Sequence, residues 1–330
     1  MPVRNGEATL EAALRSVLAQ TDPDLEVVVV DDGSTDATTE IATALGAADP
    51  RLRLVRRAPS GIVGALNAGL AACRGRYIAR MDADDRAVPE RLARQIPLLD
   101  ADPTLAVVDG RAHLFRDEGE VPEGMRRYVA WLGSVCEPED FDRSILIESP
   151  VVHPAATLRR SAVEAIGGYR DGPFPEDYDL WLRLHAAGWR LRKVPEVLVH
   201  QRDRPSRLTR TDPRYGRDAF RRARRDYLRR TLLARPRRLW LWATRRERRA
   251  WLPWLLAEGH EVVAALDVDP AKVGGRSHSV PVRSWEDLAD LDADAGLMAI
   301  AVPKGRDEAR RAVSRLWPGG VEGRDWWCVT

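Results

Sequence analysis

Apolar residues in the first part of the chain recur at two different spacings, which predicts alternating helices and strands. Residues 7–20 place leucine, alanine and valine at helical spacing, with Asn5 ahead of them as the expected N-cap. Residues 25–30 form a continuous apolar run rich in valine, which is typical of a parallel strand buried on both faces. The alternation continues with predicted helices over 35–46, 64–72 and 89–101 and predicted strands over 52–55, 77–81 and 105–109. This succession indicates an open α/β sheet, whose ligands bind beyond the carboxyl ends of the strands.

The second half of the chain repeats this alternation after a less regular stretch. Residues 113–147 show no clear period, and helices are expected over 160–166, 177–187 and 214–233. From residue 237 onward the pattern predicts strands over 238–243, 261–266 and 296–302 and helices over 246–258, 284–290 and 305–316. We therefore expect two α/β domains, residues 1–234 and 235–330, with the boundary at Ala234-Arg235-Pro236.

The composition is that of a globular protein large enough for two cores. Of 330 residues, 44% are hydrophobic and 31% are charged. No apolar run approaches the roughly 18 residues that span a bilayer, and the N-terminus does not have the layout of a signal peptide. We expect a cytoplasmic protein with reduced cysteines, and peripheral contact with the inner membrane face stays open.

Charge is distributed unevenly, although the net charge is only +2. Residues 202–249 contain 19 Arg, no Lys and 5 acidic residues, so this stretch carries +14 and the remainder −12. Such a cluster would attract nucleic acid or an anionic membrane. No recognition module accompanies it, so we expect no nucleic-acid partner. Membrane contact and burial in the core are both open for the tryptophans within it: Trp240, Trp242, Trp251 and Trp254.

An acidic segment, Met81-Asp82-Ala83-Asp84-Asp85, follows the strand predicted over residues 77–81. Mg²⁺ and Mn²⁺ prefer carboxylate oxygens and typically bind one or two of them together with phosphate oxygens. Asp82 and Asp84 at the end of a strand therefore predict a metal site that receives a nucleoside diphosphate. The alternative is an acidic loop that caps the helix beginning near Pro89, and this segment alone does not separate the two.

A second acidic segment, Asp31-Asp32-Gly33-Ser34-Thr35-Asp36, follows the strand over residues 25–30. A carboxylate there can accept hydrogen bonds from a base or a ribose, and glycine lets a ligand approach the turn. Ser34 or Asp36 is equally an ordinary N-cap for the next helix. Both roles can hold together, with Asp32 at the ligand and Ser34 at the cap.

The helix predicted over residues 177–187 begins with Glu176 and Asp177. Its apolar residues, Trp181 among them, are expected in the core, which leaves the two acids exposed at the helix start. Acids there complement the helix dipole. A carboxylate in that place can also accept the proton of an attacking hydroxyl as a general base.

Five segments, taken in chain order, resemble family 2 glycosyltransferases of the GT-A fold over roughly residues 2–210. They are MPVRNGE at 1–7, VVVDDGSTD at 28–36, ALNAGLAACRGRYIARMDADD at 65–85, GGYR with PEDYDLWLRLHAAGW at 167–189, and EVLVHQRDRPSRLTR at 196–210. The resemblance implies an open mixed sheet with helices on both faces. It also implies inverting transfer of a sugar from a nucleoside-diphosphate donor, expected to be UDP-linked, to a hydroxyl of a growing surface polysaccharide or glycolipid.

The resemblance implies roles for individual residues. Asp177 would be the catalytic base, and Asp82 and Asp84 would hold Mn²⁺ or Mg²⁺ against the diphosphate. Further donor contacts would come from Pro2, Val3, Asn5, Asp31, Asp32 and Asn67. Candidates for the diphosphate or the acceptor side are Glu176, His153, His200 and Arg202. A lone histidine beside a strand is more often structural, so that alternative stays open for His200.

One departure from the family concerns its first strand. Members carry an apolar strand ahead of the segment that corresponds to Pro2-Val3, and this sequence starts at Met1. Loss of a central strand is expected to leave backbone groups of its neighbours unpaired. Either the start codon is assigned too far downstream, which is our expectation, or the protein is catalytically impaired.

The C-terminal segment resembles a degenerate Rossmann-type domain. Asp267 ends its second strand, where such domains carry an acid, but residues 243–248 lack the glycines that let a pyrophosphate approach. We expect this domain to pack or to bind a partner, without a dinucleotide. Trp326 and Trp327 are expected to be exposed, where they would seal the domain junction.

Two other functions stay open beside the glycosyltransferase. A sugar nucleotidyltransferase also uses an α/β sheet and acidic metal ligands, but it requires a Gly-rich basic loop that residues 2–7 do not form. The other is an impaired or non-enzymatic protein that binds an anionic surface through its arginines.

Overall fold

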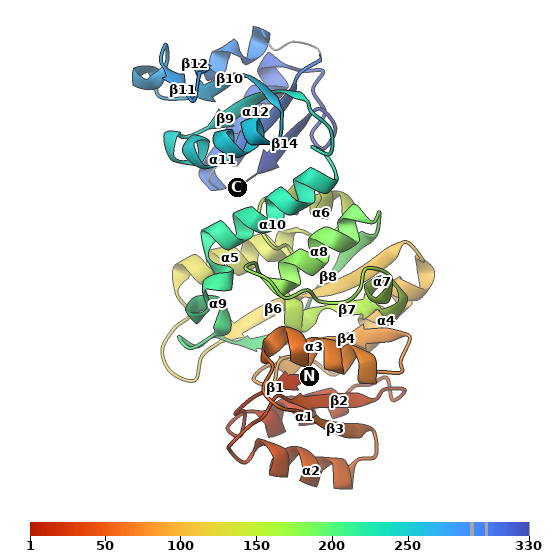
Figure 1. The fold of residues 1–330 in the computed structure, drawn as a ribbon. Helices are drawn as coiled ribbons and strands as arrows, with labels where there is room; N and C mark the ends of the chain where they lie inside the picture. The colour runs from red at the N-terminus through yellow and green to blue at the C-terminus, as the bar shows by residue number, and fades with distance from the viewer. Residues whose placement is uncertain (291–293, 301–302, 330) are drawn as a thin grey trace. The chain divides into compact units, whose positions relative to one another are not determined.

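The computed structural model of the chain describes residues 1–290, 294–300 and 303–329. The chain divides into two compact units (Figure 1). The first unit contains Met1–Phe141 and Ser149–Ala223, and the second contains Asp142–Glu148 and Arg224–Thr330. The chain passes from one to the other within helix α10 (Arg217–Arg230), upstream of the linker expected at residues 234–236.

The elements up to residue 115 follow the predicted alternation. They are β1 (Pro2–Val3), α1 (Leu10–Leu18), β2 (Val27–Asp31), α2 (Thr38–Ala48), β3 (Leu52–Arg56), α3 (Gly61–Ala72), β4 (Tyr77–Ala79), β5 (Arg86–Ala87), α4 (Arg91–Ala101) and β6 (Leu105–Phe115). The chain continues with α5 (Glu123–Ser134), α6 (Pro138–Ser144), η1 (His153–Ala155), β7 (Thr157–Arg159), α7 (Arg160–Ala165), α8 (Glu176–Ala186), β8 (Arg190–Arg202), α9 (Leu208–Thr211), η2 (Pro213–Tyr215) and α10.

A parallel three-stranded sheet, in the order β1-β2-β3, begins the first unit. All five residues of β2 are buried, as its continuous apolar sequence predicts. Val27 and Val29 pack with residues of α1 and α2, whereas Val28 and Val30 pack with α3. Helices therefore cover both faces of this sheet, with α3 on one side of β2 and α2 on the other in Figure 1. The expectation of an α/β sheet covered on both faces is confirmed.

The rest of the first unit is built on a mixed five-stranded sheet in the order β4-β7-β6-β8-β5. Two sequence expectations are corrected here. The strand expected over 105–109 extends to Phe115 because it pairs in parallel with the long strand β8. The stretch expected to be irregular contains α5 and α6, which the many charged residues between its apolar positions obscured.

A cavity lies between the two sheets of the first unit, next to β1. β1 has two residues, and ahead of it the Met1 amine donates a hydrogen bond to the Val28 carbonyl at 2.8 Å. Burial lowers the pKa of this amine to about 6. The cavity, of about 590 Å³, separates β2 from β4 and is lined by Met1, Val28, Val30, Leu66, Ile78 and Met81 among others. The two sheets of the first unit are therefore discontinuous at this point.

The second unit is a smaller α/β layer. Its elements are β9 (Arg238–Ala243), α11 (Arg245–Ala257), β10 (Glu261–Asp267), η3 (Pro270–Lys272), β11 (Arg276–Ser277), β12 (Val280–Ser284), η4 (Trp285–Asp290), β13 (Gly296–Ile300), α12 (Pro303–Leu316) and β14 (Trp326–Val329). The sheet order is β11-β12-β10-β9-β13-β14, and its strands are parallel except for the short β11. Strand order reverses around β9, which is the Rossmann-like arrangement expected. Residues 301–302 of the expected strand lie outside the described residues.

Four of the eight tryptophans in the second unit are buried, and the other four are half-buried. Trp326 and Trp327 are 4% and 6% exposed because β14 pairs in parallel with β13, so the expectation that they are exposed is wrong. Trp240 and Trp251 are also buried, so these two side chains belong to the core and are not available for membrane contact.

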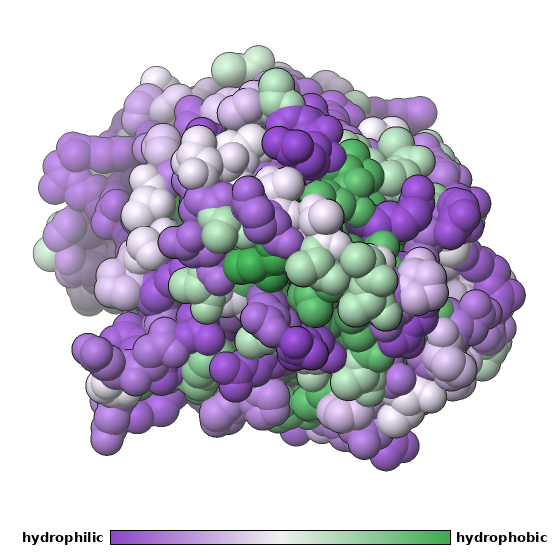
Figure 2. Space-filling model, turned by 90° about the horizontal axis from the view of Figure 1, so that it is seen from below, coloured by the Kyte–Doolittle hydropathy of each residue, from purple (hydrophilic) through white to green (hydrophobic). Residues whose placement is uncertain are grey.

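The arginines of α10 are largely committed to partners within their own units. Arg224 donates to the Ile147 carbonyl, Arg225 donates to the Ala250 carbonyl, and Arg229 pairs with Glu258. In the described part of the chain, none of the helices is both long and apolar enough to cross a membrane. The face seen in Figure 2 is mostly hydrophilic, with a narrow band of apolar residues.

Candidate active site

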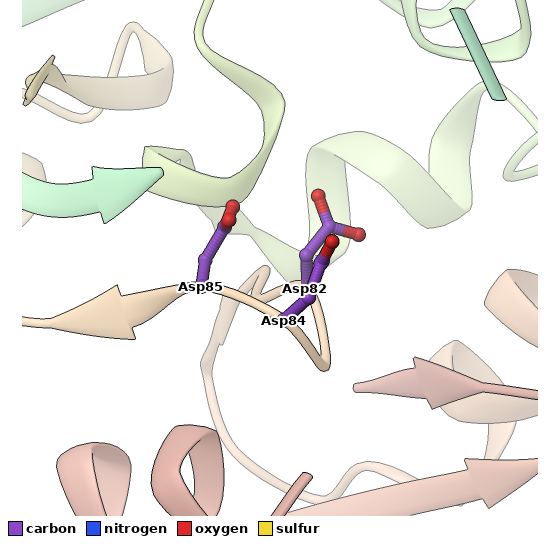
Figure 3. A group of neighbouring side chains, drawn as sticks. All are labelled: Asp82, Asp84 and Asp85. Carbon is purple, nitrogen blue, oxygen red and sulfur yellow. The ribbon is translucent and has the colours of Figure 1, made fainter. Parts of the chain in front are cut away.

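Three carboxylates gather on the loop between β4 and β5. Asp82, Asp84 and Asp85 project to the same side of this loop (Figure 3), and their ligand oxygens lie within 4.8 Å of one another. Asp85 is buried, whereas Asp82 and Asp84 are half-buried. The loop leaves the carboxyl end of β4, so the site is at the sheet edge where the sequence placed it.

Like charges at this spacing repel, and the structure does not fully compensate them. Burial, followed by the charges of Asp82 and Asp84, raises the pKa of Asp85 to about 8. Burial and Asp82 also raise the pKa of Asp84. Within the described residues, the second oxygen of Asp85, Oδ2, is buried without a hydrogen-bond partner. Clustered carboxylate oxygens with an unused acceptor fit a hard divalent cation such as Mg²⁺ or Mn²⁺, which would remove this repulsion.

Arg80 connects this cluster to the next part of the site. Its guanidinium, 7% exposed, lies 2.5 Å from Asp82 Oδ1. Its positive charge acts on Asp82, on Tyr169 and on Asp177, so these groups share one electrostatic environment. Sequence reasoning did not single out Arg80, since an arginine at the end of a strand has no diagnostic spacing.

The end of β8 brings two arginines to the acidic loop. The Arg202 backbone N–H donates to Asp85 Oδ1 at 2.8 Å, and its guanidinium donates to the Asp84 carbonyl and pairs with Asp117. Arg204 Nη2 lies 2.9 Å from Asp84 Oδ2. Sequence reasoning named Arg202 but missed Arg204, although the alternation of arginines in this segment was visible.

His200 does not join this group. It lies on β8 opposite Arg86 and His113, and its Nδ1 is 3.4 Å from His113 Nδ1. Burial and the charges of His113 and Arg86 lower the pKa of His200.

The segment after β2 forms a compact turn. Asp31 accepts hydrogen bonds from the Ser34 backbone N–H and the Thr39 hydroxyl. Asp32 accepts hydrogen bonds from the backbone N–H groups of Ser60 and Gly61 and from the Ser60 hydroxyl, so it holds the start of α3.

Gly33 has a φ of +76°, and a Cβ there would lie 2.6 Å from the Pro59 ring. Glycine is therefore required at this turn both for its backbone conformation and for the space around it.

The first residues of the chain fasten this turn. The Val3 carbonyl accepts a hydrogen bond from the Asp32 N–H, and Pro2 pairs with Val30 on β2. Asn5, at a φ of +52°, accepts a hydrogen bond from the Thr35 N–H. Asn5 is thus not the cap of α1, as expected from its position, because α1 begins later, at Leu10.

Asn67 joins α3 to the segment that follows α7. Its amide donates to the Tyr169 carbonyl and accepts from the Tyr169 N–H, each at 2.9 Å. The Tyr169 hydroxyl lies 2.7 Å from His153 Nε2. His153 is buried, with a pKa held well below its usual value by burial and by Arg80, so its imidazole is neutral.

The start of α8 supplies the candidate base. Asp177 is half-buried, and burial together with the charge of Glu176 raises its pKa to about 7. Glu176 is 3% exposed and accepts a hydrogen bond from the Tyr215 hydroxyl at 2.7 Å. The expectation that both acids are exposed is therefore wrong for Glu176, because Tyr215 covers it. Trp181 is fully buried, which confirms its place in the core.

The residues fall into three groups with different chemical capacities. Asp82, Asp84 and Asp85 offer oxygen ligands for a cation. Asp177 offers a carboxylate whose pKa is raised to about 7. The positive charge of Arg80 acts on both Asp82 and Asp177. A hydroxyl can displace an anionic leaving group where carboxylates hold a cation against that group and a further carboxylate with a pKa near 7 accepts the hydroxyl proton.

The chain was compared with known proteins. The model of the family described as glycosyl transferase family 2 matches residues 1–167. The EpsE protein of Bacillus subtilis is 33% identical over 208 residues, 62% of this chain and 71% of EpsE. Amylovoran biosynthesis glycosyltransferase AmsE of Erwinia amylovora is 29% identical over 194 residues, 58% of this chain and 70% of AmsE.

The fold is similar to that of a solved glycosyltransferase. A crystal structure of S. aureus TarS 1-349 in complex with UDP-GlcNAc has a TM-score of 0.53 and 20% sequence identity, covering 64% of this chain and 59% of that one. This likeness confirms the expected GT-A architecture. Since the family model covers half of the sequence and includes the acidic loop, the chain belongs to glycosyltransferase family 2.

Proposed function

We propose that the first unit transfers a sugar from a UDP-linked donor to a hydroxyl of a glycan or lipid-linked glycan, with inversion at the anomeric carbon. The observation that carries this proposal is the three-carboxylate cluster together with Asp177, a carboxylate whose pKa is raised to about 7 and which is influenced by the same arginine, Arg80, as Asp82. AmsE is named for polysaccharide biosynthesis, which supports a growing polysaccharide as the acceptor.

Asp177 is the group that takes the proton in this mechanism. The acceptor oxygen attacks the anomeric carbon as the bond from that carbon to the phosphate oxygen breaks, and the diphosphate leaves with the electron pair. The acceptor proton passes to the Asp177 carboxylate, which is ionised above its pKa of about 7. The neutral imidazole of His153 holds the Tyr169 hydroxyl, and Asn67 holds the Tyr169 backbone, so both keep this side of the site in place.

The donor side is formed by the acidic loop and the turn after β2. Asp82 and Asp84 would hold Mn²⁺ or Mg²⁺, and Asp85 supports them from the buried side. A bound cation would stabilise the charge that develops on the diphosphate. Asp31, Asp32 and Asn5 shape the turn that receives the nucleoside, close to Pro2 and Val3. Arg202 fixes the loop through the Asp84 carbonyl and Asp85.

The second unit is proposed as a packing or partner-binding domain without a dinucleotide. Asp267, at the end of β10, pairs with Arg248 at 3.0 Å, and both side chains are buried. The acid that would bind a ribose is therefore already bound by an internal partner.

A panel of nucleotides tests the function. The melting temperature of the full chain is measured with UDP, GDP or dTDP, each with and without Mn²⁺. We expect UDP with Mn²⁺ to raise it most, because ligands that bind only the folded state stabilise it. If none of the nucleotides shifts the melting temperature in the presence of metal, the proposal fails. Transfer from UDP-sugars to a glycan acceptor is then measured with the nucleotide that binds.

A further inference from the structure

We propose that Arg204 is an internal counter-cation for Asp84 that a divalent cation displaces, after which its guanidinium pairs with the donor diphosphate. The inference rests on the proposed function and adds a residue to the donor site. It comes from the one ion pair that joins the acidic loop to the segment after β8 through side chains within the described residues.

The pair occupies the oxygen that a cation requires. Arg204 Nη2 is 2.9 Å from Asp84 Oδ2, and the side chains are 48% and 17% exposed. Asp84 is repelled by Asp82, and Arg204, followed by Arg207, supplies the compensating positive charge. A guanidinium at hydrogen-bond distance takes up acceptor capacity on this oxygen, so it competes with a metal ion for Asp84.

The backbone of Arg204 is anchored while its side chain extends to the loop. Asp203 is buried and pairs with Arg116 and Arg210. The Arg204 carbonyl accepts hydrogen bonds from the Arg207 N–H at 3.2 Å and from Arg210 Nη1 at 2.9 Å. Displacement from Asp84 therefore moves only the side chain, and the guanidinium stays within reach of whatever binds beside Asp84.

Arg202 differs from Arg204 in this respect. Its side chain is 9% exposed and is held by the Asp84 carbonyl, by Asp117 and by the Phe115 ring. Arg202 thus fixes the loop, whereas Arg204 holds a single half-exposed ion pair. An exposed ion pair is worth little, so a divalent cation assisted by phosphate oxygens outcompetes it. Two phosphate oxygens then offer the freed, planar guanidinium a bidentate partner.

The test measures metal and nucleotide binding separately. Arg204→Met keeps an unbranched apolar stem and removes the charged guanidinium, and Arg204→Lys keeps the charge. Arg217→Met, at the exposed start of α10, is the matched control. Free Mn²⁺ is followed by electron paramagnetic resonance in titrations with each protein, and UDP binding is then measured calorimetrically at saturating Mn²⁺.

Opposite changes are expected in the two measurements. In Arg204→Met, the Kd for Mn²⁺ alone should fall by about two- to fivefold, because the competing ion pair is gone. The Kd for UDP with Mn²⁺ should rise by about tenfold or more, because a charged hydrogen bond to phosphate is lost. Arg204→Lys should lie between this variant and the wild type, and Arg217→Met should match the wild type.

The outcomes separate this inference from the proposed function. If the wild type binds neither Mn²⁺ nor UDP, the proposed function fails. If the wild type binds both, and Arg204→Met leaves the Mn²⁺ Kd unchanged or raises it, the inference is overturned. Should Arg204→Met fold poorly in a thermal unfolding scan, Arg204→Lys decides by the same two constants.

Discussion

Acidic residues end strands in both units, but their charges are balanced in different ways. After β4, Asp82, Asp84 and Asp85 lie together and two of them have raised pKa values. After β10, Asp267 is paired with a buried arginine and accepts the Asp269 N–H. The same position in an α/β sheet is thus only partly compensated in the first unit, where Arg80 and Arg204 face three carboxylates, and is neutralised in the second. Incompletely compensated charge at a strand end, rather than the strand end alone, marks the candidate ligand site.

The broadest effect is expected from Asp84→Asn, which removes a charge from the partly compensated edge and should impair both donor binding and transfer. Transfer should fall by about 10²–10³-fold, because a group that stabilises the leaving charge is lost. Mn²⁺-dependent binding of UDP should disappear in calorimetry. Asp267→Asn, the acid of the other edge, is the comparison and should leave UDP binding unchanged. Equal loss of binding in both variants would contradict the distinction between the two edges.

Asp177→Asn should slow sugar transfer without weakening donor binding. Transfer is expected to fall by about 10²–10⁴-fold, the usual worth of a general base. The Kd for UDP with Mn²⁺ should stay close to that of the wild type, because Asp177 lies on α8 and not on the acidic loop. An Asp177→Asn enzyme with wild-type rates would refute its assignment as base.

Arg248→Met tests the neutralised edge, because it leaves the buried Asp267 carboxylate without its ion-pair partner. A buried carboxylate left without its partner should cost about 3–5 kcal/mol of unfolding free energy. Chemical denaturation measures the loss, and UDP binding to the first unit should be unaffected. The double variant Arg248→Met/Asp267→Leu should recover most of the stability, because no charge is then buried. If it is as unstable as the single variant, packing rather than charge explains the loss.

Raised pKa values predict opposite pH trends for activity and stability. Asp177 must lose its proton to act as base, so transfer should fall about tenfold per pH unit below pH 7. The folded state binds these protons more tightly than the unfolded state, since the pKa values of Asp177 and Asp85 are raised. Their stabilising contribution is fully present below the unfolded pKa of about 4 and is lost progressively as pH rises from there to about 7 to 8.

Transfer rates measured with saturating Mn²⁺, and melting temperatures measured without metal, test these two trends. Asp177→Asn should weaken the decline of the melting temperature between about pH 4 and pH 7. A melting temperature that rises from pH 6 to about pH 9 in the wild type would contradict the burial of these carboxylates.

The smallest effect is expected at the arginine-rich surface. Several arginines of α10 are already paired within the protein. Exposed arginines such as Arg245 and Arg246, at the start of α11, are therefore the ones that an anionic membrane can reach. Pelleting with anionic liposomes should be weak and should vanish with salt. Replacing both arginines with alanine should remove what remains. Strong, salt-resistant pelleting would show that the second unit has a membrane role after all.

The sequence predicts those elements whose residues are all in the same surroundings, such as a strand that is buried on both faces. β2 is buried on both faces, and its valines make it unmistakable. β8 was missed because charged residues and a proline interrupt its apolar positions, and its identity as a strand depends on pairing with β6. Local pattern cannot report a partner that lies about 80 residues away.

The candidate site shows the same limit. Asp82 and Asp84 are found from their spacing, and Asp177 from its place at a helix start. Arg204 and Arg80 are found only from their contacts, because an arginine has no fixed distance in sequence from the acid it pairs with. Their pairing also depends on β8 and β4 meeting the same loop, which only the folded chain establishes.

Lysine is scarce in this protein, and the few lysines are unequally accessible. Of Lys193, Lys272 and Lys304, the first is in the first unit, where its ammonium is enclosed with Asp109 and the Pro150 carbonyl. Asp109 in turn accepts the Val152 N–H, next to His153. Lysine-directed reagents therefore attach to the second unit, at Lys272 for example. Dyes or surface tethers joined in this way would leave the acidic loop and α8 unmodified, which suits fluorescence and immobilised-enzyme measurements on the transfer reaction.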